Sequence, residues 1–166
     1  YTASDGATLM WSATKGLGNF IHEIAVIGTD TGSGLEQFKS KSQNDNAVIT
    51  VEDNDQTIAD DNYFTIANDN GTGSWTSFNV PSGWERINKV WQAQETGDVG
   101  TVDFYVDTDD TDFNLDNLSG AAAYYMLIDT DGDDSFSDES LATGGLVQMY
   151  DDGTNGDVVA GDLVFT

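Results

Sequence analysis

Apolar and polar residues alternate with a period of two along much of this chain. Val102, Phe104 and Val106 alternate with Asp103 and Tyr105, which is the pattern of a strand with one buried face. Clusters of Gly, Asn, Asp and Ser separate such runs, and the chain has one Pro. No stretch shows convincing spacing for an amphipathic helix. Patterning of this kind restricts the chain to β-sheet architectures.

Short strand-like runs recur along the whole length. We expect strands at residues 8–13, 21–27, 47–52, 63–67, 75–80, 87–94, 101–107, 122–129, 146–150 and 157–165. Residues 35–41 are instead compatible with a short helical turn. About nine to ten strands with Asp/Gly turns predict an all-β, antiparallel β-sandwich with jelly-roll or Greek-key connections. Without an internal repeat or linker, the expected organisation is one domain over residues 1–166.

The charge balance excludes several classes of protein. Thirty acidic residues, of which 24 are Asp and six are Glu, outnumber five basic ones, and the net charge is -25. Five basic residues cannot form a phosphate-binding surface, so we expect no nucleic-acid partner. The chain has no Cys, which excludes thiol catalysis and Cys-based metal sites. No apolar run approaches membrane-spanning length, so we expect a protein that is not membrane-embedded.

One acidic segment has the composition of a metal loop. Residues 129–139 read Asp-Thr-Asp-Gly-Asp-Asp-Ser-Phe-Ser-Asp-Glu, and carboxylates at alternate positions can surround a hard cation such as Ca²⁺. An EF-hand requires Gly at position 6 and Glu at position 12, but this loop has Asp134 and Ser140 there. We therefore expect a Ca²⁺ loop between two strands, and the alternative is a solvated acidic turn. The candidate ligands are Asp129, Asp131, Asp133, Asp138 and Glu139.

Other candidate sites are less distinctive. Residues 107–112 contain a second acidic run in which Asp107 and Asp109 are candidate metal ligands, or again a solvated turn. His22 is the only His, no G-x-S-x-G motif accompanies it, and no particular carboxylate pair stands out for glycoside hydrolysis. We therefore expect no enzyme activity. An exposed Trp84 or Trp75 would provide a stacking surface for a sugar, which keeps a carbohydrate-binding module open as the alternative.

Residues 86–102 carry the most specific sequence pattern. They read Arg-Ile-Asn-Lys-Val-Trp-Gln-Ala-Gln-Glu-Thr-Gly-Asp-Val-Gly-Thr-Val. This segment resembles the R-x-x-K-V-W-x-x-x-E-T-G-x-V-G-T-V signature of an uncharacterised β domain in large secreted and cell-surface, adhesin-like bacterial proteins. Residues 1–6 and 27–42 resemble two further segments of that family, although Thr29 stands where the family usually has Arg. Within the signature, we expect Glu95 to bond to Arg86 or Lys89.

The resemblance implies an exported surface module with no known catalytic residues. Combined with the acidic loops, it predicts an extracellular or cell-surface, Ca²⁺-binding structural or adhesive module. The expected partners are copies of itself or neighbouring domains of a surface protein, with polysaccharide as the partner in the alternative. In a filament, a terminal strand at residues 8–13 or 157–165 would complete the sheet of a neighbouring subunit.

Overall fold

The computed structural model describes residues 1–12, 20–44, 47–107, 124–151 and 158–164, with side chains described up to residue 149. These residues form twelve strands and no helix. The described part of the chain therefore contains no helix that could span a membrane. The strands are β1 (His22–Asp30), β2 (Leu35–Gln37), β3 (Lys39–Lys41), β4 (Ile49–Glu52), β5 (Tyr63–Asn68), β6 (Trp75–Thr76), β7 (Arg86–Ile87), β8 (Trp91–Thr96), β9 (Thr101–Val106), β10 (Tyr124–Leu127), β11 (Leu146–Asp151) and β12 (Val158–Val164).

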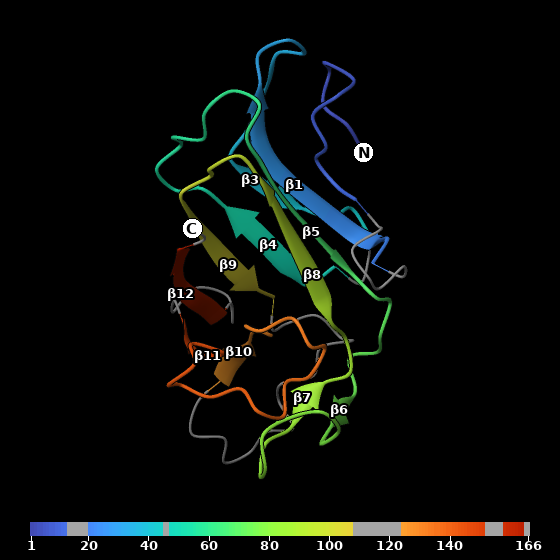
Figure 1. The fold of residues 1–166 in the computed structure, drawn as a ribbon, viewed down its shortest axis with the longest axis vertical. Helices are drawn as coiled ribbons and strands as arrows, with labels where there is room; N and C mark the ends of the chain where they lie inside the picture. Colours follow the sequence, from blue (N-terminus) through green and yellow to red (C-terminus); the bar gives the residue numbers. More distant parts are fainter. Residues whose placement is uncertain (13–19, 45–46, 108–123, 152–157, 165–166) are drawn as a thin grey trace.

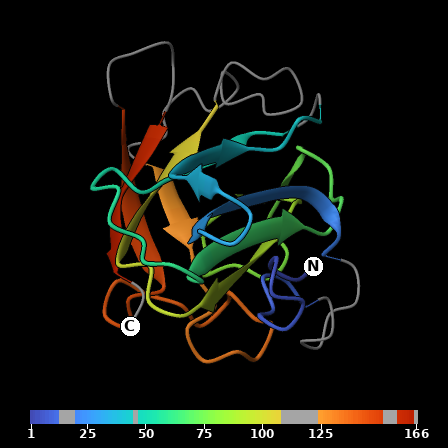
Figure 2. The ribbon, with the colours of Figure 1, turned by 90° about the horizontal axis from the view of Figure 1, so that it is seen from above.

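Two antiparallel sheets face each other as a β-sandwich. One sheet has the strand order β2-β1-β5-β8 and the other has the order β10-β11-β12-β9-β4-β3. A small ribbon of β6 and β7 lies at one end (Figure 1), and Figure 2 shows the blue and green strands on the opposite side from the red ones. The all-β, antiparallel sandwich expected from the sequence is confirmed, with more strands than the nine or ten anticipated.

The core lies between the two sheets. Val102, Phe104 and Val106 are buried as the alternation predicted, with exposed fractions of 0%, 4% and 7%. The rings of Phe64 and Phe104 meet edge to face across the interface, with centroids 5.7 Å apart. Nine buried side chains from both sheets and their connections form the main cluster, namely Ala25, Ile27, Val51, Ile58, Phe64, Ile66, Val99, Val102 and Phe104. Burial of these apolar surfaces is the main force that holds the sheets together.

Residues 35–41 differ from expectation. The helical turn predicted there is wrong, because the segment forms β2 in one sheet and β3 in the other. Phe38 lies between these two strands and packs against the main core, while its carbonyl accepts a hydrogen bond of 2.7 Å from Asp53 N. One apolar residue at the crossover, rather than a periodic pattern, therefore fixes this connection.

The N-terminal segment, residues 1–12, lies on the outer face of the four-stranded sheet. Residues 8–12 form no strand, and their contacts are made largely by side chains instead. Thr65 Oγ1 donates to Met10 O at 2.8 Å, and Thr96 Oγ1 donates to Leu9 O at 2.6 Å. Trp11, only 3% exposed, joins Phe20 and Ala67 in a second small core. The N-terminal segment is thus a layer on the sandwich rather than a free strand.

The segment that carries the sequence signature connects the two sheets. It runs along β8, turns at Gly97 and Gly100, whose φ angles are +76° and +69°, and enters β9. Glu95 does not bond to Arg86 or Lys89 as expected. Its Oε1 accepts a hydrogen bond of 3.0 Å from Val99 N, which closes the turn.

Lys89 forms an ion pair with Glu23 at the start of β1. Its Nζ lies 2.8 Å from Glu23 Oε1, and both side chains are more than nine-tenths buried. Asn68 also donates to Glu23, so the buried carboxylate has two donors. A buried ion pair is tolerated only when its remaining polar atoms are hydrogen-bonded in this way. At the position where the resembled family usually has Arg, the buried Thr29 donates its hydroxyl to Ile58 O at 3.0 Å.

Asp30 fastens the N-terminal segment to the turn after β1. Its carboxylate accepts hydrogen bonds from Ser4 Oγ at 2.7 Å, Ser4 N at 2.9 Å and Ser33 N at 3.1 Å. These donors, the Ser4 hydroxyl first among them, lower the pKa of Asp30 from 3.8 to about 2. Because the folded-state pKa is depressed, this contribution to stability is present above pH 4 and is lost as the pH falls towards 2.

Replacement of Ser4 tests this assignment. In Ser4→Ala the hydroxyl donor is lost, so the pKa of Asp30 should rise from about 2 towards its ordinary value of 3.8, as measured by a carboxyl ¹³C NMR titration. The stability that is lost between pH 4 and pH 2 through Asp30 should then be smaller than in the wild type, because the folded-state pKa lies closer to the unfolded one. The matched control is Ser82→Ala, which removes an exposed serine and should leave the Asp30 titration unchanged. An Asp30 titration that is identical in Ser4→Ala would contradict the assignment.

Candidate functional site

The loop between β10 and β11 brings three of the predicted metal ligands together. Carboxylate oxygens of Asp129, Asp131 and Asp133 all lie within 4.8 Å of one another. Two oxygens bound to one Ca²⁺ at 2.3–2.6 Å can be at most roughly 5 Å apart, so the three side chains are close enough to share an ion. Asp131 and Asp133 are exposed and Asp129 is half-buried, which leaves the cluster open to solvent.

Backbone hydrogen bonds set the shape of this loop. Asp129 accepts from Gly132 N at 2.7 Å and from Asp134 N at 2.9 Å, one bond to each carboxylate oxygen. Gly132 and Asp134 both adopt positive φ, at +76° and +65°, which lets the chain curl around the Asp129 side chain. Desolvation opposes ionisation of Asp129, but these backbone donors outweigh it and lower its pKa. The loop is therefore folded around a charged Asp129.

The pKa of Asp131 is shifted in the opposite direction and is raised. Desolvation raises its pKa, and the negative charges of Asp133, Asp138 and Asp129 add to the increase. Like charges at such short range disfavour the ionised form, so the cluster carries uncompensated repulsion. A bound cation is one way to relieve it, and protonation at low pH is the other.

Glu139 has a different role from the three clustered aspartates. Its side chain is 5% exposed and accepts hydrogen bonds from Thr130 N at 2.7 Å and Thr143 Oγ1 at 2.9 Å. These bonds lower its pKa, with the Thr130 backbone bond as the largest cause. Gly145 lies so close that a Cβ there would overlap the Glu139 carboxylate. Glu139 thus joins the two ends of the loop and is not part of the cluster, and neither is the exposed Asp138.

The same loop docks on the segment that contains β6 and β7. Asn79 accepts from Phe136 N at 3.0 Å and donates to Asp134 O at 3.0 Å. Arg86 lies over the Phe136 ring, with 5.6 Å between the guanidinium carbon and the ring centroid. The loop is therefore held at its tip as well as at its ends.

The remaining sequence candidates lie elsewhere. Asp107 forms an ion pair with Lys41 at 2.8 Å, and Asp109 falls outside the described residues. Trp84 and Trp75 are both half-buried, and the Trp84 ring meets Tyr125 of β10 edge to face at 5.0 Å. Part of the Trp84 ring is therefore used in packing against Tyr125, and the rest is open to solvent.

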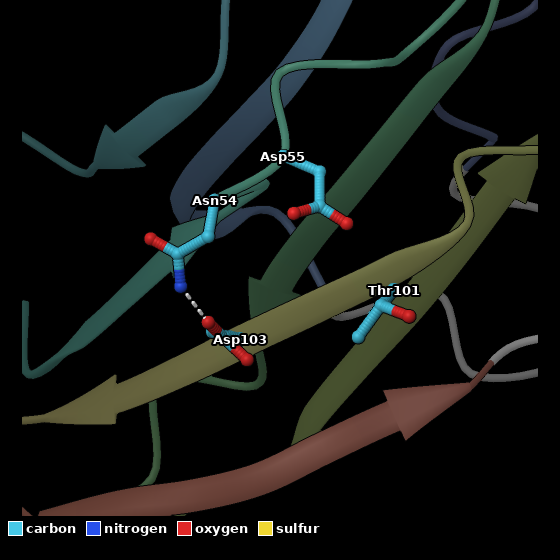
Figure 3. A pocket seen from close by; sticks show the side chains of 4 residues that line it. All are labelled: Asn54, Asp55, Thr101 and Asp103. Carbon is cyan, nitrogen blue, oxygen red and sulfur yellow. Dashed lines mark hydrogen bonds between the residues drawn. The ribbon is translucent and has the colours of Figure 1, made fainter.

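A polar pocket that the sequence did not indicate lies beside β9. Asn54, Asp55, Thr101 and Asp103 line it (Figure 3), and its volume is about 210 Å³. Figure 3 shows the Asn54 amide donating to the Asp103 carboxylate, with Asp55 extending from the same loop as Asn54. These side chains come from positions about fifty residues apart and share no local motif. Only the pairing of β4 with β9, which places Glu52 opposite Asp103, brings them together.

The contrast between two neighbouring acids tests the role of Glu139. Glu139→Ala removes the acceptor shared by Thr130 and Thr143, so the free energy of unfolding should fall by about 2–3 kcal/mol in chemical denaturation. The control Asp138→Ala alters an exposed side chain and should change it by less than about 0.5 kcal/mol. Equal effects of the two substitutions would show that Glu139 does not hold the loop ends.

Comparison with known proteins identifies a family but no function. No curated protein and no solved structure matches the chain. The model of one protein family, a domain of unknown function (DUF8202), matches residues 1–159. This match includes the sandwich core, the signature segment and the acidic loop, so the chain belongs to the DUF8202 family.

Proposed function

We propose that this chain is an extracellular, Ca²⁺-binding structural or adhesive module of a surface protein. The observation that carries the proposal is the convergence of Asp129, Asp131 and Asp133, whose carboxylate oxygens lie within 4.8 Å of one another. Oxygen ligands of this kind suit Ca²⁺, which binds carboxylates in flexible geometry. The raised pKa of Asp131 supports the proposal, because a divalent ion would favour the ionised carboxylate that desolvation, and to a lesser degree repulsion by neighbouring acids, disfavours.

The exposure of the cluster favours function outside the cell. Asp131 and Asp133 are open to solvent, and an exposed site with three carboxylates should bind Ca²⁺ weakly. Weak sites, with dissociation constants of about 10⁻⁴–10⁻³ M, are typical of extracellular modules, where Ca²⁺ is abundant. Such a site would be filled permanently and would serve stability rather than signalling.

The position of the loop gives bound Ca²⁺ a mechanical role. The loop spans from β10 to β11 and contacts the β6–β7 segment through Asn79 and Phe136. An ion in the loop would neutralise part of the charge of -25 and stiffen the contact between these elements. Both effects stabilise the folded state without any catalytic step.

The strand pairing within the fold limits which strands could be donated or accepted in a filament. β12, the strand proposed for donation, pairs with β11 and β9 inside its own sheet, and residues 8–12 lie on the outer face of the other sheet. Donation of β12 would therefore require exchange between subunits. Within the described strands, β8, β2, β10 and β3 lie at the sheet edges and could accept a neighbouring strand directly.

Thermal unfolding tests the Ca²⁺ site. Because Ca²⁺ binds the folded state, Ca²⁺ at 100 times its Kd should stabilise the protein by about 2.7 kcal/mol and raise the Tm by about 5–10 °C. Differential scanning calorimetry with added CaCl₂, and again with EDTA, measures the shift. Asp131→Asn should abolish most of it, whereas Asp98→Asn makes the same chemical change in the β8–β9 turn and should retain it. A Tm that is the same in Ca²⁺ and in EDTA would refute the proposed site.

Assembly is a separate prediction. If the module forms filaments by strand exchange or edge pairing, its weight-average mass in analytical ultracentrifugation should rise with protein concentration in the presence of Ca²⁺. The Asp131→Asn variant should assemble less than Asp98→Asn at the same concentration. A mass equal to one chain at all concentrations, with and without Ca²⁺, would rule out self-assembly and leave a module that acts within a larger chain.

A further inference from the structure

We propose that the pocket beside β9 binds a single neutral sugar residue. Its lining consists of Asn54, Asp55, Thr101 and Asp103, on different elements from the tryptophans considered above. Val102 and Phe104 belong to the core, so the alternation of β9 places Thr101 and Asp103 on the opposite, outer side of the sheet. A sugar at the end or along the side of a glycan chain could reach this side from solvent.

The loop that forms one wall is held rigidly. Asp53, only 2% exposed, accepts hydrogen bonds from four successive backbone N–H groups through its carboxylate. The donor–acceptor distances are 3.0 Å from Asp55, 3.1 Å from Gln56, 2.9 Å from Thr57 and 3.2 Å from Ile58. Asn54 and Asp55 are therefore presented by a fixed backbone. A preformed wall reduces the entropy lost on binding and so favours even a small ligand.

The lining groups match the hydrogen-bonding pattern of a polyol. Asp103 is 8% exposed, and the amide of Asn54 donates to it, which orients the carboxylate. The Asp103 and Asp55 carboxylates can accept bonds from sugar hydroxyls, while the Thr101 hydroxyl and the Asn54 amide can donate as well as accept. Hydrogen bonds to ionised groups are the stronger ones. A sugar hydroxyl can act as both donor and acceptor and so can satisfy both kinds of group.

The size and charge of the pocket narrow the class of ligand that it can bind. The volume of 210 Å³ is many times the roughly 10–15 Å³ that one water needs on the same measure, so the pocket has room for a ligand the size of a sugar ring and far more than a bare ion needs. None of the four lining residues is basic. Lys39, on the neighbouring strand, is engaged by Glu52 at 2.7 Å and lies 5.0 Å from the Tyr105 ring centroid. A lining with two carboxylates and no basic residue should disfavour uronic acids and sulfated sugars, so the preferred ligand is neutral.

Chemical-shift mapping of the ¹⁵N-labelled full chain tests the proposal. The probes are the methyl glycosides of glucose, galactose, mannose, xylose and N-acetylglucosamine, each at 50 mM in EDTA, so that the result is independent of the Ca²⁺ site. At least one neutral glycoside should shift the amide signals of residues 53–56 and 101–104 in a saturable manner. Galacturonic acid at the same concentration and pH should not.

Two variants separate binding from folding. Asp55→Asn removes one exposed carboxylate from the pocket and should weaken the responsive glycoside by about tenfold, the loss expected for about 1.4 kcal/mol. Glu36→Gln makes the equivalent change at an exposed position on β2 of the other sheet and should bind normally. The proposal is overturned if no glycoside shifts these signals, if galacturonic acid shifts them equally, or if only CaCl₂ does. It is also overturned if Asp55→Asn, with an otherwise native spectrum, binds as tightly as Glu36→Gln.

Discussion

Aspartate side chains that accept backbone N–H hydrogen bonds hold the connections of this sandwich in place. Asp53 organises the loop after β4, Asp30 the turn after β1, and Asp129 the loop after β10. A short carboxylate reaches nearby N–H groups in a turn more readily than Glu does, which favours Asp over Glu at these three positions. Much of the acidity is therefore structural, because turns that would otherwise leave backbone donors exposed are completed by charged acceptors.

The signature segment serves a second structural purpose, since it couples the sheets. Glu95 closes the turn from β8 to β9 through Val99, whose side chain is 2% exposed in the main core. Lys89 meets Glu23 in a buried ion pair. Removal of Lys89 would leave the buried Glu23 carboxylate without its counter-ion, a change that costs about 3–5 kcal/mol. Packing and turn geometry thus explain why Glu95 and Lys89 occur in this segment.

Period-two patterning predicted β9 correctly because Val102 and Phe104 both belong to the main core, although Asp103 between them is buried as well. The patterning failed at residues 35–41, where two strands of three residues belong to different sheets and neither is long enough to establish a period. The acidic loop was recognisable because its aspartates stand at alternate positions in one short segment. The pocket was not, because Asn54 and Asp103 meet only through the pairing of β4 with β9, and local sequence carries no record of that register.

The architecture of the acidic loop also limits what Ca²⁺ can contribute. Glu139 already joins the loop ends, and backbone N–H groups already fix Asp129, so little chain ordering remains to be done when an ion binds. The unfavourable effects that remain are the desolvation of Asp131 and, after it, the repulsion from neighbouring acids, which together raise the pKa of Asp131. A cation bound in the proposed site would therefore act by electrostatics on a preformed loop. Binding should stabilise the fold while leaving its backbone conformation largely unchanged, in contrast to small metal-dependent domains whose folding requires the ion.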